Sequence, residues 1–238
     1  MSDVRDFNRI LLTGAGSGIG RACAELLASR GKSLALTGLN PEKLDRVASG
    51  VQASRVWARP ADITQPAAVR ELFDGAAAEF GGIDAVIHCA GVGLIRPLEE
   101  VAGPEFLQVM NVNVRGCFHV LKEACRIMAP AKKGRFVTIP GILGVRPMKG
   151  ATVYCASKYA VTGMIQAAAE EYRRHQLQFS LYHFGGVDTP FWDSIEMRVD
   201  RTQMIPVEVA ARRICDDLDL PSHLVLGQTI LQPASHQL

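Results

Sequence analysis

Two side chains that could carry out acid–base chemistry, Tyr154 and Lys158, lie four residues apart. The surrounding pattern predicts a helix from Thr152 to Arg174, and this spacing puts both side chains on one helix face, a turn apart. An ammonium beside a phenol favours the phenolate and lowers the pKa of the phenol. A tyrosine tuned in this way can act as a general acid or base near neutral pH. Because a solvated helical pair has the same spacing, the elements around the pair must decide between the two interpretations.

A glycine-rich segment near the start of the chain has the arrangement of a phosphate-binding loop. An apolar strand is predicted at residues 9–13, and a helical pattern runs through Arg30. The turn between them exposes backbone N–H groups at a helix N-terminus, where the helix dipole favours an anion. Glycines also let a pyrophosphate approach the main chain. The setting favours cofactor binding over a purely structural turn for the residues Gly14, Ala15, Gly16, Ser17, Gly18, Ile19 and Gly20.

Strands and helices alternate along the rest of the chain. Further strands are predicted at residues 33–37, 56–58, 85–88, 135–139, 179–183, and 224–226 with 228–231. Helices are predicted between them, at 65–80, 104–128 and 206–218 among others, and we expect Asn40 to cap the helix that Pro41 begins. The alternation predicts an α/β fold: a Rossmann-like doubly wound parallel sheet of about seven strands, with helices on both faces. Residues 1–238 are expected to form a single domain.

Composition and charge argue against several classes of function. The net charge is +2 with both signs mixed along the chain, so no nucleic-acid partner is expected. No apolar run is long enough to span a bilayer, and no signal region follows the charged N-terminus, so we expect no membrane association. The six cysteines are scattered without a C-x-x-C pair, which suits reduced thiols in a cytoplasmic protein. The histidines show no metal-ligand spacing with them, so no metal site is expected.

Four features follow one another in order: the segment Thr13-Gly14-x-x-x-Gly18-x-Gly20, Asp62, Asn113, and Tyr154-x-x-x-Lys158. Together they resemble the short-chain dehydrogenase/reductase family over nearly the whole chain. The resemblance implies an NAD or NADP cofactor, with the glycine segment at the pyrophosphate, Asp62 at the adenine and the region around residue 189 at the nicotinamide. The cofactor-binding residues that it implies are Gly14, Gly16, Ser17, Gly18, Ile19, Gly20, Leu39, Asn40, Asp62, Ile63, Ala90, Gly91, Tyr154, Lys158, Val187 and Thr189.

The same resemblance implies a role for each of three catalytic residues. Tyr154 is the proton donor to a carbonyl, or the base that takes a proton from an alcohol. Lys158 holds the nicotinamide ribose hydroxyls and, with the positive nicotinamide ring, lowers the pKa of Tyr154. Asn113 supports a water that links Lys158 to solvent, and Asn111 fits the family spacing less well.

The chain departs from the family where a catalytic serine is expected after the fifth strand, because Gly141 stands there. Loss of one preorganised hydrogen-bond donor typically lowers the rate by roughly 10²–10³. Three explanations remain open. Another donor substitutes, the candidates being Thr138, Thr152, His88 or the Gly141 N–H; the substrate is oriented by its own polar group or by shape; or efficient chemistry has been lost.

Two functions from different classes follow. The first is an NAD(P)-dependent oxidoreductase that moves a hydride between a nicotinamide and a carbonyl or secondary alcohol. The second is a catalytically impaired nucleotide-binding regulatory or scaffold protein with the same fold. A third class that the fold also serves, non-redox dehalogenation, is disfavoured by Lys158 and the intact glycine segment.

The expected cofactor and substrate depend on a few side chains. Gly38 places no acid where NAD-preferring proteins bond the ribose hydroxyls, and Leu39 supplies no arginine for a 2′-phosphate. Because Ser17, Asn40 and Lys43 could serve a phosphate, NADP is slightly favoured over NAD. The substrate side is expected to include Gly141, Ile142, Phe191 and the loop 190–205.

The loop 190–205 carries several apolar residues, which fit either ordinary packing or a lid over the cofactor. Either arrangement suits a partly hydrophobic carbonyl or alcohol as substrate. By resemblance alone, the helices matching residues 105–128 and 152–174 imply a homodimer or homotetramer.

Overall fold

Seven parallel strands form one sheet in the order β3-β2-β1-β4-β5-β6-β7. The computed structural model describes residues 7–221 and 223–236. The five inner strands are mostly buried, as expected where helices cover both faces of a parallel sheet, and the two edge strands are partly exposed. The predicted doubly wound fold is confirmed by the strands β1 Arg9–Thr13, β2 Ser33–Thr37, β3 Arg55–Ala58, β4 Ala85–His88, β5 Gly134–Thr138, β6 Leu177–Phe184 and β7 Gln228–Leu231.

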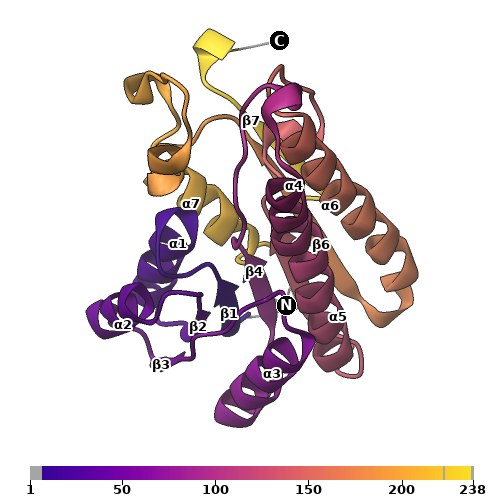
Figure 1. Cartoon of the computed structure of the whole chain (residues 1–238). Helices are drawn as coiled ribbons and strands as arrows, with labels where there is room; N and C mark the ends of the chain where they lie inside the picture. The colour runs from indigo at the N-terminus through magenta and orange to yellow at the C-terminus, as the bar shows by residue number, and fades with distance from the viewer. Residues whose placement is uncertain (1–6, 222, 237–238) are drawn as a thin grey trace.

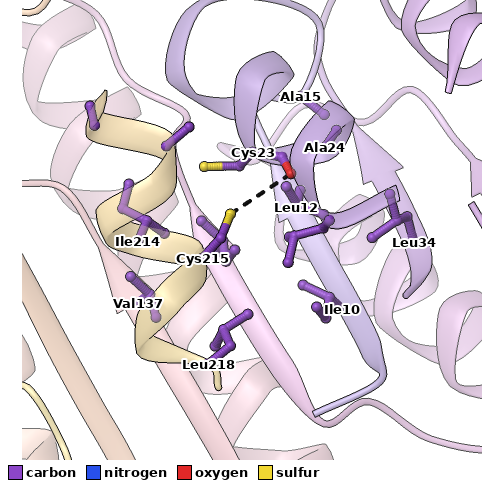
Figure 2. Packing of buried hydrophobic residues seen from close by; sticks show 14 of the residues in the cluster. Ile10, Leu12, Ala15, Cys23, Ala24, Leu34, Val137, Ile214, Cys215 and Leu218 are labelled. Atoms are coloured by element: carbon purple, nitrogen blue, oxygen red, sulfur yellow. Dashed lines mark hydrogen bonds between the residues drawn. The ribbon is translucent and has the colours of Figure 1, made fainter. Parts of the chain in front are cut away.

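Helices cover both faces of the sheet (Figure 1). One face packs against α1 Gly18–Ser29, α2 Pro41–Gly50 and α7 Val207–Asp217. The other packs against α3 Pro66–Phe80, α5 Cys117–Met128 and α6 Thr152–Glu171, with α4 Gly103–Val109 leading into α5. Figure 2 shows Cys215 of α7 facing Cys23 of α1, with its sulfur 3.9 Å from the Cys23 carbonyl oxygen. Each face of the sheet therefore has its own apolar core.

Local sequence sets several helix ends as predicted. Asn40 Oδ1 accepts a hydrogen bond from the Lys43 N–H at 2.8 Å and so caps α2, which Pro41 begins. Gly81 has a φ of 73° and ends α3 in the left-handed conformation. These ends depend on residues next to one another in the chain, which is why a pattern can find them.

Three predicted elements differ from the structure. The helix expected at 104–128 is divided into α4, a π-helical segment Met110–Gly116 and α5. The helix expected to reach Arg174 ends at Glu171, before a short 3-10 turn at Arg173–His175. Residues 224–226 are not part of a strand. In the π-helical segment a Cβ on Gly116 would lie 2.7 Å from Ile63, so packing across to the Asp62–Ile63 turn fixes that wider turn.

The cofactor crevice predicted for such a sheet lies where the chain reverses its direction of winding. Here β1 lies between β2 and β4, so the connections leaving the carboxyl ends of β1 and β4 diverge. The loops after the two strands meet closely, since a Cβ on Gly14 would lie 2.8 Å from the Ala90 backbone nitrogen. The glycine-rich segment and the Ala90–Gly91 turn therefore lie side by side at the carboxyl ends of β1 and β4.

A buried ion pair ties the amino end of β5 to α7. The side chains of Arg135 and Asp217 are both 0% exposed, and Arg135 Nη1 lies 2.7 Å from Asp217 Oδ1. Arg135 also donates to Gln178 Oε1 at 2.9 Å and to the Leu224 carbonyl at 2.8 Å. Burial lowers the pKa of Arg135 and raises the pKa of Asp217, because each charge loses its hydration. For each charge, the ion pair with the other side chain is therefore the main interaction that offsets the hydration lost on burial.

The six cysteines are free thiols; five are buried and Cys89 is partly exposed. Within residues 7–221 and 223–236, no helix combines the length and the apolar character needed to cross a membrane. Across the same ranges, no three histidine, cysteine or acidic side chains are grouped so as to hold a metal ion.

Candidate active site

Helix α6 brings Tyr154 and Lys158 together as their spacing predicts. Lys158 Nζ lies 5.4 Å from the centre of the Tyr154 ring and donates to the Ile139 carbonyl at 3.4 Å. Burial lowers the pKa of Lys158 to about 8. Burial also raises the pKa of Tyr154 well above its ordinary value in the protein alone, opposite to the lowering expected from Lys158. The phenol is therefore neutral and able to donate its proton.

Asn113 connects the π-helical segment to the loop after β4 and to α6. Its Oδ1 accepts from the Val92 N–H at 2.9 Å, and its Nδ2 donates to the Val92 carbonyl at 2.9 Å and to Ser157 Oγ at 3.0 Å. Ser157 in turn donates to the Tyr154 carbonyl at 2.7 Å. Because both amide hydrogens are bonded to protein atoms, the side chain of Asn113 acts first as a brace.

Ser157 and Val92 belong to this network but were not among the predicted site residues. Ser157 could have been found from its place immediately before Lys158, where its hydroxyl can reach the carbonyl one turn earlier in the helix. The role of Val92 is carried by its backbone, so no side-chain pattern indicates it. The network fixes the start of α6, and with it Tyr154, against the loop after β4.

The glycine-rich segment forms an uncovered backbone cradle at the N-terminus of α1. Gly14 and Gly18 have φ values of 68° and 51°, which favour glycine. A Cβ on Gly20 would lie 2.3 Å from the Gly14 carbonyl oxygen, so the helix and the turn can meet only at a glycine. Ser17 stands at the N-cap position and makes no capping bond, which leaves its hydroxyl for a ligand. These residues fit the pyrophosphate of a dinucleotide.

Other predicted cofactor residues meet at the same crevice. A Cβ on Gly91 would lie 3.2 Å from Asn113 Oδ1 and 3.6 Å from Lys158 Nζ, so the Ala90–Gly91 turn borders these two predicted site residues. A Cβ on Gly18 would lie 3.4 Å from Thr189, which brings the segment after β6 beside the glycine cradle. Val187, two residues before Thr189, is buried and pairs with Ile205. Ile19 is half-buried against the core of the α1 face.

The residues predicted to lie near the adenine and its ribose are Leu39, Asn40, Asp62 and Ile63, and several of their polar groups are bonded within the protein. Asp62 Oδ1 accepts from the Thr64 N–H at 2.9 Å and from the Thr64 hydroxyl at 2.8 Å. Ile63 is turned into the core, and its carbonyl oxygen accepts from His119 Nδ1 at 3.1 Å. Leu39 is 75% exposed. Asn40 uses its side-chain oxygen to cap α2.

Gly141, which stands where the family has a catalytic serine, lacks the hydroxyl and also has a backbone conformation that a serine rarely adopts. Gly141 has φ 73° and ψ 175°, a region that is essentially restricted to glycine. Its N–H donates to the Tyr182 carbonyl at 3.2 Å, and its carbonyl accepts from His183 Nδ1 at 3.1 Å. A Cβ there would meet only the Phe184 carbonyl at 3.6 Å, so space is present but the conformation is unfavourable.

Two of the four proposed substitute donors are bonded elsewhere, and a third, His88, is bonded through one of its two ring nitrogens. Thr138 donates to the His88 carbonyl at 3.2 Å, and the Gly141 N–H is used by Tyr182. His88 Nδ1 lies 2.8 Å from Thr13 Oγ1, and burial lowers the pKa of His88 to about 3, so the ring is a neutral core histidine. The fourth candidate, Thr152, is exposed at the start of α6.

Phe191 lies beside Tyr154. Its ring lies 5.9 Å from the Tyr154 ring, at an interplanar angle of 30°. It belongs to a 3-10 turn, Pro190–Ser194, at the start of the predicted substrate-side loop. Ile142 begins another such turn, Ile142–Gly144, immediately after Gly141.

A family model and curated relatives match this chain over most of its length. A family model described as short chain dehydrogenase matches residues 8–200. An uncharacterized oxidoreductase of Staphylococcus aureus (strain MW2) is 31% identical over 223 residues, 94% of this chain and 96% of the relative. Sepiapterin reductase of Chlorobaculum tepidum is 27% identical over 235 residues, 95% of this chain and 96% of the relative.

Solved structures share the fold. An alcohol dehydrogenase from the archaeon Thermococcus sibiricus, complexed with 5-hydroxy-NADP, matches with a TM-score of 0.87 at 24% identity, over 97% of this chain and 98% of that chain. The family model spans the glycine cradle, the brace at Asn113 and the pair on α6. The chain therefore belongs to the short-chain dehydrogenase family of oxidoreductases.

Proposed function

We propose that this chain is an NAD(P)-dependent oxidoreductase that transfers a hydride between a nicotinamide and a carbonyl compound or secondary alcohol. The observation that carries the proposal is the joint placement of Tyr154, Lys158 and the Asn113 brace beside the glycine cradle. A protein that only bound a nucleotide would not need a neutral phenol and an ammonium at the end of the crevice.

In this proposal one group of residues binds the cofactor and Tyr154 transfers the proton. The glycine cradle, Asp62, Gly91, Val187 and Thr189 would hold the cofactor, and the bound nicotinamide supplies a hydride to a carbonyl carbon or accepts one from an alcohol. In reduction, Tyr154 donates its proton to the carbonyl oxygen as that oxygen gains charge; in oxidation it takes the proton back.

Lys158 stabilises the phenolate that Tyr154 becomes when it gives up its proton. With a pKa of about 8, Lys158 keeps its ammonium form at neutral pH and loses it as the pH rises above that value. In this proposal Lys158 also holds the ribose hydroxyls, and the Asn113 brace keeps the start of α6 in place.

The absence of a serine hydroxyl is compatible with this function. A lost donor of that kind costs about 3–4 kcal/mol of transition-state stabilisation. Enzymes as a class supply about 8–23 kcal/mol in total. Catalysis would therefore be slower than with a complete site, but far above the uncatalysed rate.

The direct test is oxidation of NADPH and NADH, followed by absorbance, across a panel of ketones, with the reverse reaction across alcohols. Turnover that is lost in Tyr154→Phe supports the proposal. If no compound gives a rate above that of Tyr154→Phe, the proposal is wrong and the second candidate stands.

That second candidate is a nucleotide-binding protein with an impaired site. It is favoured by one specific observation: the Thr138 hydroxyl and the Gly141 N–H are bonded elsewhere, as is Nδ1 of His88. It requires measurable cofactor affinity together with no turnover.

Replacing Gly141 with serine is expected to lower the free energy of unfolding by about 1–3 kcal/mol, because a side chain must adopt a glycine conformation. The gain in kcat/KM is expected to stay below about threefold, because the backbone does not direct the hydroxyl as a serine site would. Gly141→Ala is the matched control, with the same strain and no hydroxyl. A gain of tenfold or more in Gly141→Ser alone would contradict this expectation.

We propose NADP(H) as the preferred cofactor. Position 38 carries no acid, and Leu39 points into solvent. A groove of about 320 Å³ beside the cradle is lined by Ser17, by the cationic side chains of Arg21, Lys43 and Arg46, and by one carboxylate, Glu25, which pairs with Arg21 at 3.5 Å. A Cβ on Gly16 would lie 3.2 Å from Lys43 Cβ, so Lys43 stands at the mouth of the cradle.

Replacing Lys43 with alanine is expected to raise the Kd for NADPH about fivefold, the loss of about 1 kcal/mol typical of an exposed charge pair. The Kd for NADH should stay within about twofold, because NADH lacks the 2′-phosphate. Fluorescence titration of the reduced cofactors measures both, with Arg174→Ala as a remote control for loss of a cation. An equal loss for the two cofactors would refute a 2′-phosphate role for Lys43.

We further propose a homodimer or homotetramer that associates through α5 and α6. Phe118 on α5 and Tyr159 on α6 are 48% and 45% exposed, large apolar surfaces that association would cover. Light scattering of the purified protein tests this, and a monomeric mass would refute it. The free thiols also suit the cytoplasmic location expected from the sequence.

A further inference from the structure

Gly93, in the loop after β4, leaves a space that the ring of Phe191 fills. A Cβ on Gly93 would lie 2.3 Å and 2.5 Å from two ring carbons of Phe191 and 3.1 Å from Ile195 Cδ1. Gly93 is not among the residues with positive φ, so its backbone does not require glycine. What the position requires is the absence of a side chain, because the Phe191 ring occupies that volume.

A ring contact and several hydrogen bonds of neighbouring residues hold Phe191 beside Tyr154. It meets Trp192 edge-on at 5.3 Å, and Trp192 Nε1 donates to the Val187 carbonyl at 2.9 Å. Farther along, Arg201 donates to Asp193 Oδ1 at 2.8 Å and to the Thr189 carbonyl at 3.1 Å. These bonds fasten the turn Pro190–Ser194 to the segment that leaves β6, so the position of the ring is defined by the fold.

The ring therefore forms an apolar wall beside the tyrosine that would protonate the substrate. Ile195 is 8% exposed and lies behind the same space. At a serine site a hydroxyl would orient the substrate by a hydrogen bond, but Gly141 supplies none. A flat apolar group of the substrate can be oriented instead by contact with an aromatic face.

We propose that Phe191, seated over Gly93, is the positioning residue that orients the substrate in place of the missing serine. The favoured substrates are then ketones and secondary alcohols that carry a flat apolar substituent beside the reacting carbon. This inference rests on the proposed function and names the substrate class of the same site.

The test compares two ketones in four proteins: wild type, Phe191→Ala, Gly93→Ala and the double variant. With acetophenone, Phe191→Ala is expected to lower kcat/KM by roughly 10–100-fold, the scale on which hydrophobic pockets discriminate. With acetone the loss should be under about threefold, because acetone has no flat substituent to meet the wall. A merely structural role for Phe191 would lower both rates equally.

Gly93→Ala should act by pushing the ring away from Tyr154, since its Cβ would occupy the position of the ring edge. We expect the same selective loss, and no further loss when Gly93→Ala is added to Phe191→Ala. Gly103→Ala is the matched control, because a Cβ there meets nothing within 4 Å. Additive losses, equal losses for both ketones, or a gain in either single variant would overturn the inference.

A binding measurement separates this inference from the proposed function. In a Trp57→Phe background Trp192 is the single tryptophan, and its emission reports ketone binding beside the Phe191 ring. Phe191→Ala should weaken acetophenone binding at least tenfold and leave acetone binding within about twofold. Equal binding changes contradict the inference even if turnover is seen, whereas selective binding without turnover in wild type contradicts only the proposed function.

Discussion

Replacing Tyr154 with phenylalanine is expected to lower kcat for ketone reduction by roughly 10²–10⁴-fold, the contribution typical of a positioned general acid. The ring and its contact with Phe191 are retained, because only the hydroxyl is removed. The Kd for the reduced cofactor should change by less than about threefold, since the glycine cradle and Lys158 are untouched. Initial rates and fluorescence titration provide the two values.

Tyr159→Phe is the matched control for this prediction, because Tyr159 lies on the same helix and is 45% exposed. Its kcat should equal that of wild type. If Tyr154→Phe kept more than about a tenth of the wild-type kcat, another group would be the proton donor, and the assignment of Tyr154 would be wrong.

Replacing Arg135 with methionine is expected to lower the free energy of unfolding by about 3–5 kcal/mol, because it leaves the Asp217 carboxylate buried without its partner. The Gln178 and Leu224 acceptors also lose a donor. The site lies at the amino end of β5, away from the catalytic crevice, so kcat of the folded protein should be little changed. Urea unfolding followed by circular dichroism measures the loss.

The double variant Arg135→Met with Asp217→Leu provides the control. Replacing a whole buried pair with apolar residues is often neutral or stabilising, so most of the lost stability should return. If the double variant were less stable than Arg135→Met alone, the cost would arise from lost packing rather than from an unpaired charge.

Much of the fold could be predicted because its signals are local. Each strand is a short apolar run, and the caps at Asn40 and Gly81 depend on neighbouring residues. The order of the glycine-rich segment, Asn113, Tyr154 and Lys158 was sufficient for the resemblance to the family to which the chain belongs, and through it for the parallel sheet. These features follow from periodicity and spacing, which the sequence displays directly.

What could not be predicted depends on contacts between distant residues. The brace from Asn113 to Val92 joins positions 21 apart, and the pair Arg135 and Asp217 joins positions 82 apart. The sequence shows that Gly141 lacks a hydroxyl, but not that its backbone is held in a glycine conformation. The fit of Phe191 over Gly93 likewise requires the packing of two loops, and no local pattern encodes it.

Electrostatics also required the structure. The spacing of Tyr154 and Lys158 predicts a lowered pKa for the phenol, yet burial raises it. Spacing gives the distance between two charges, whereas burial depends on every segment that packs around them. In the protein without cofactor the phenol is therefore protonated, the form that the proposed proton donor needs.

The most direct measurement of the central claim is transfer of an isotope from cofactor to product. Wild-type protein is incubated with a ketone and with NADPH that carries deuterium in place of both hydrogens at the reducing carbon of the nicotinamide ring, and the product is analysed by mass spectrometry. The account predicts an alcohol with one deuterium on its carbinol carbon in wild type and Tyr159→Phe, and almost none in Tyr154→Phe. Binding of NADPH without any deuterated alcohol, across ketones with and without flat apolar substituents, would contradict the claim that this site is a working oxidoreductase.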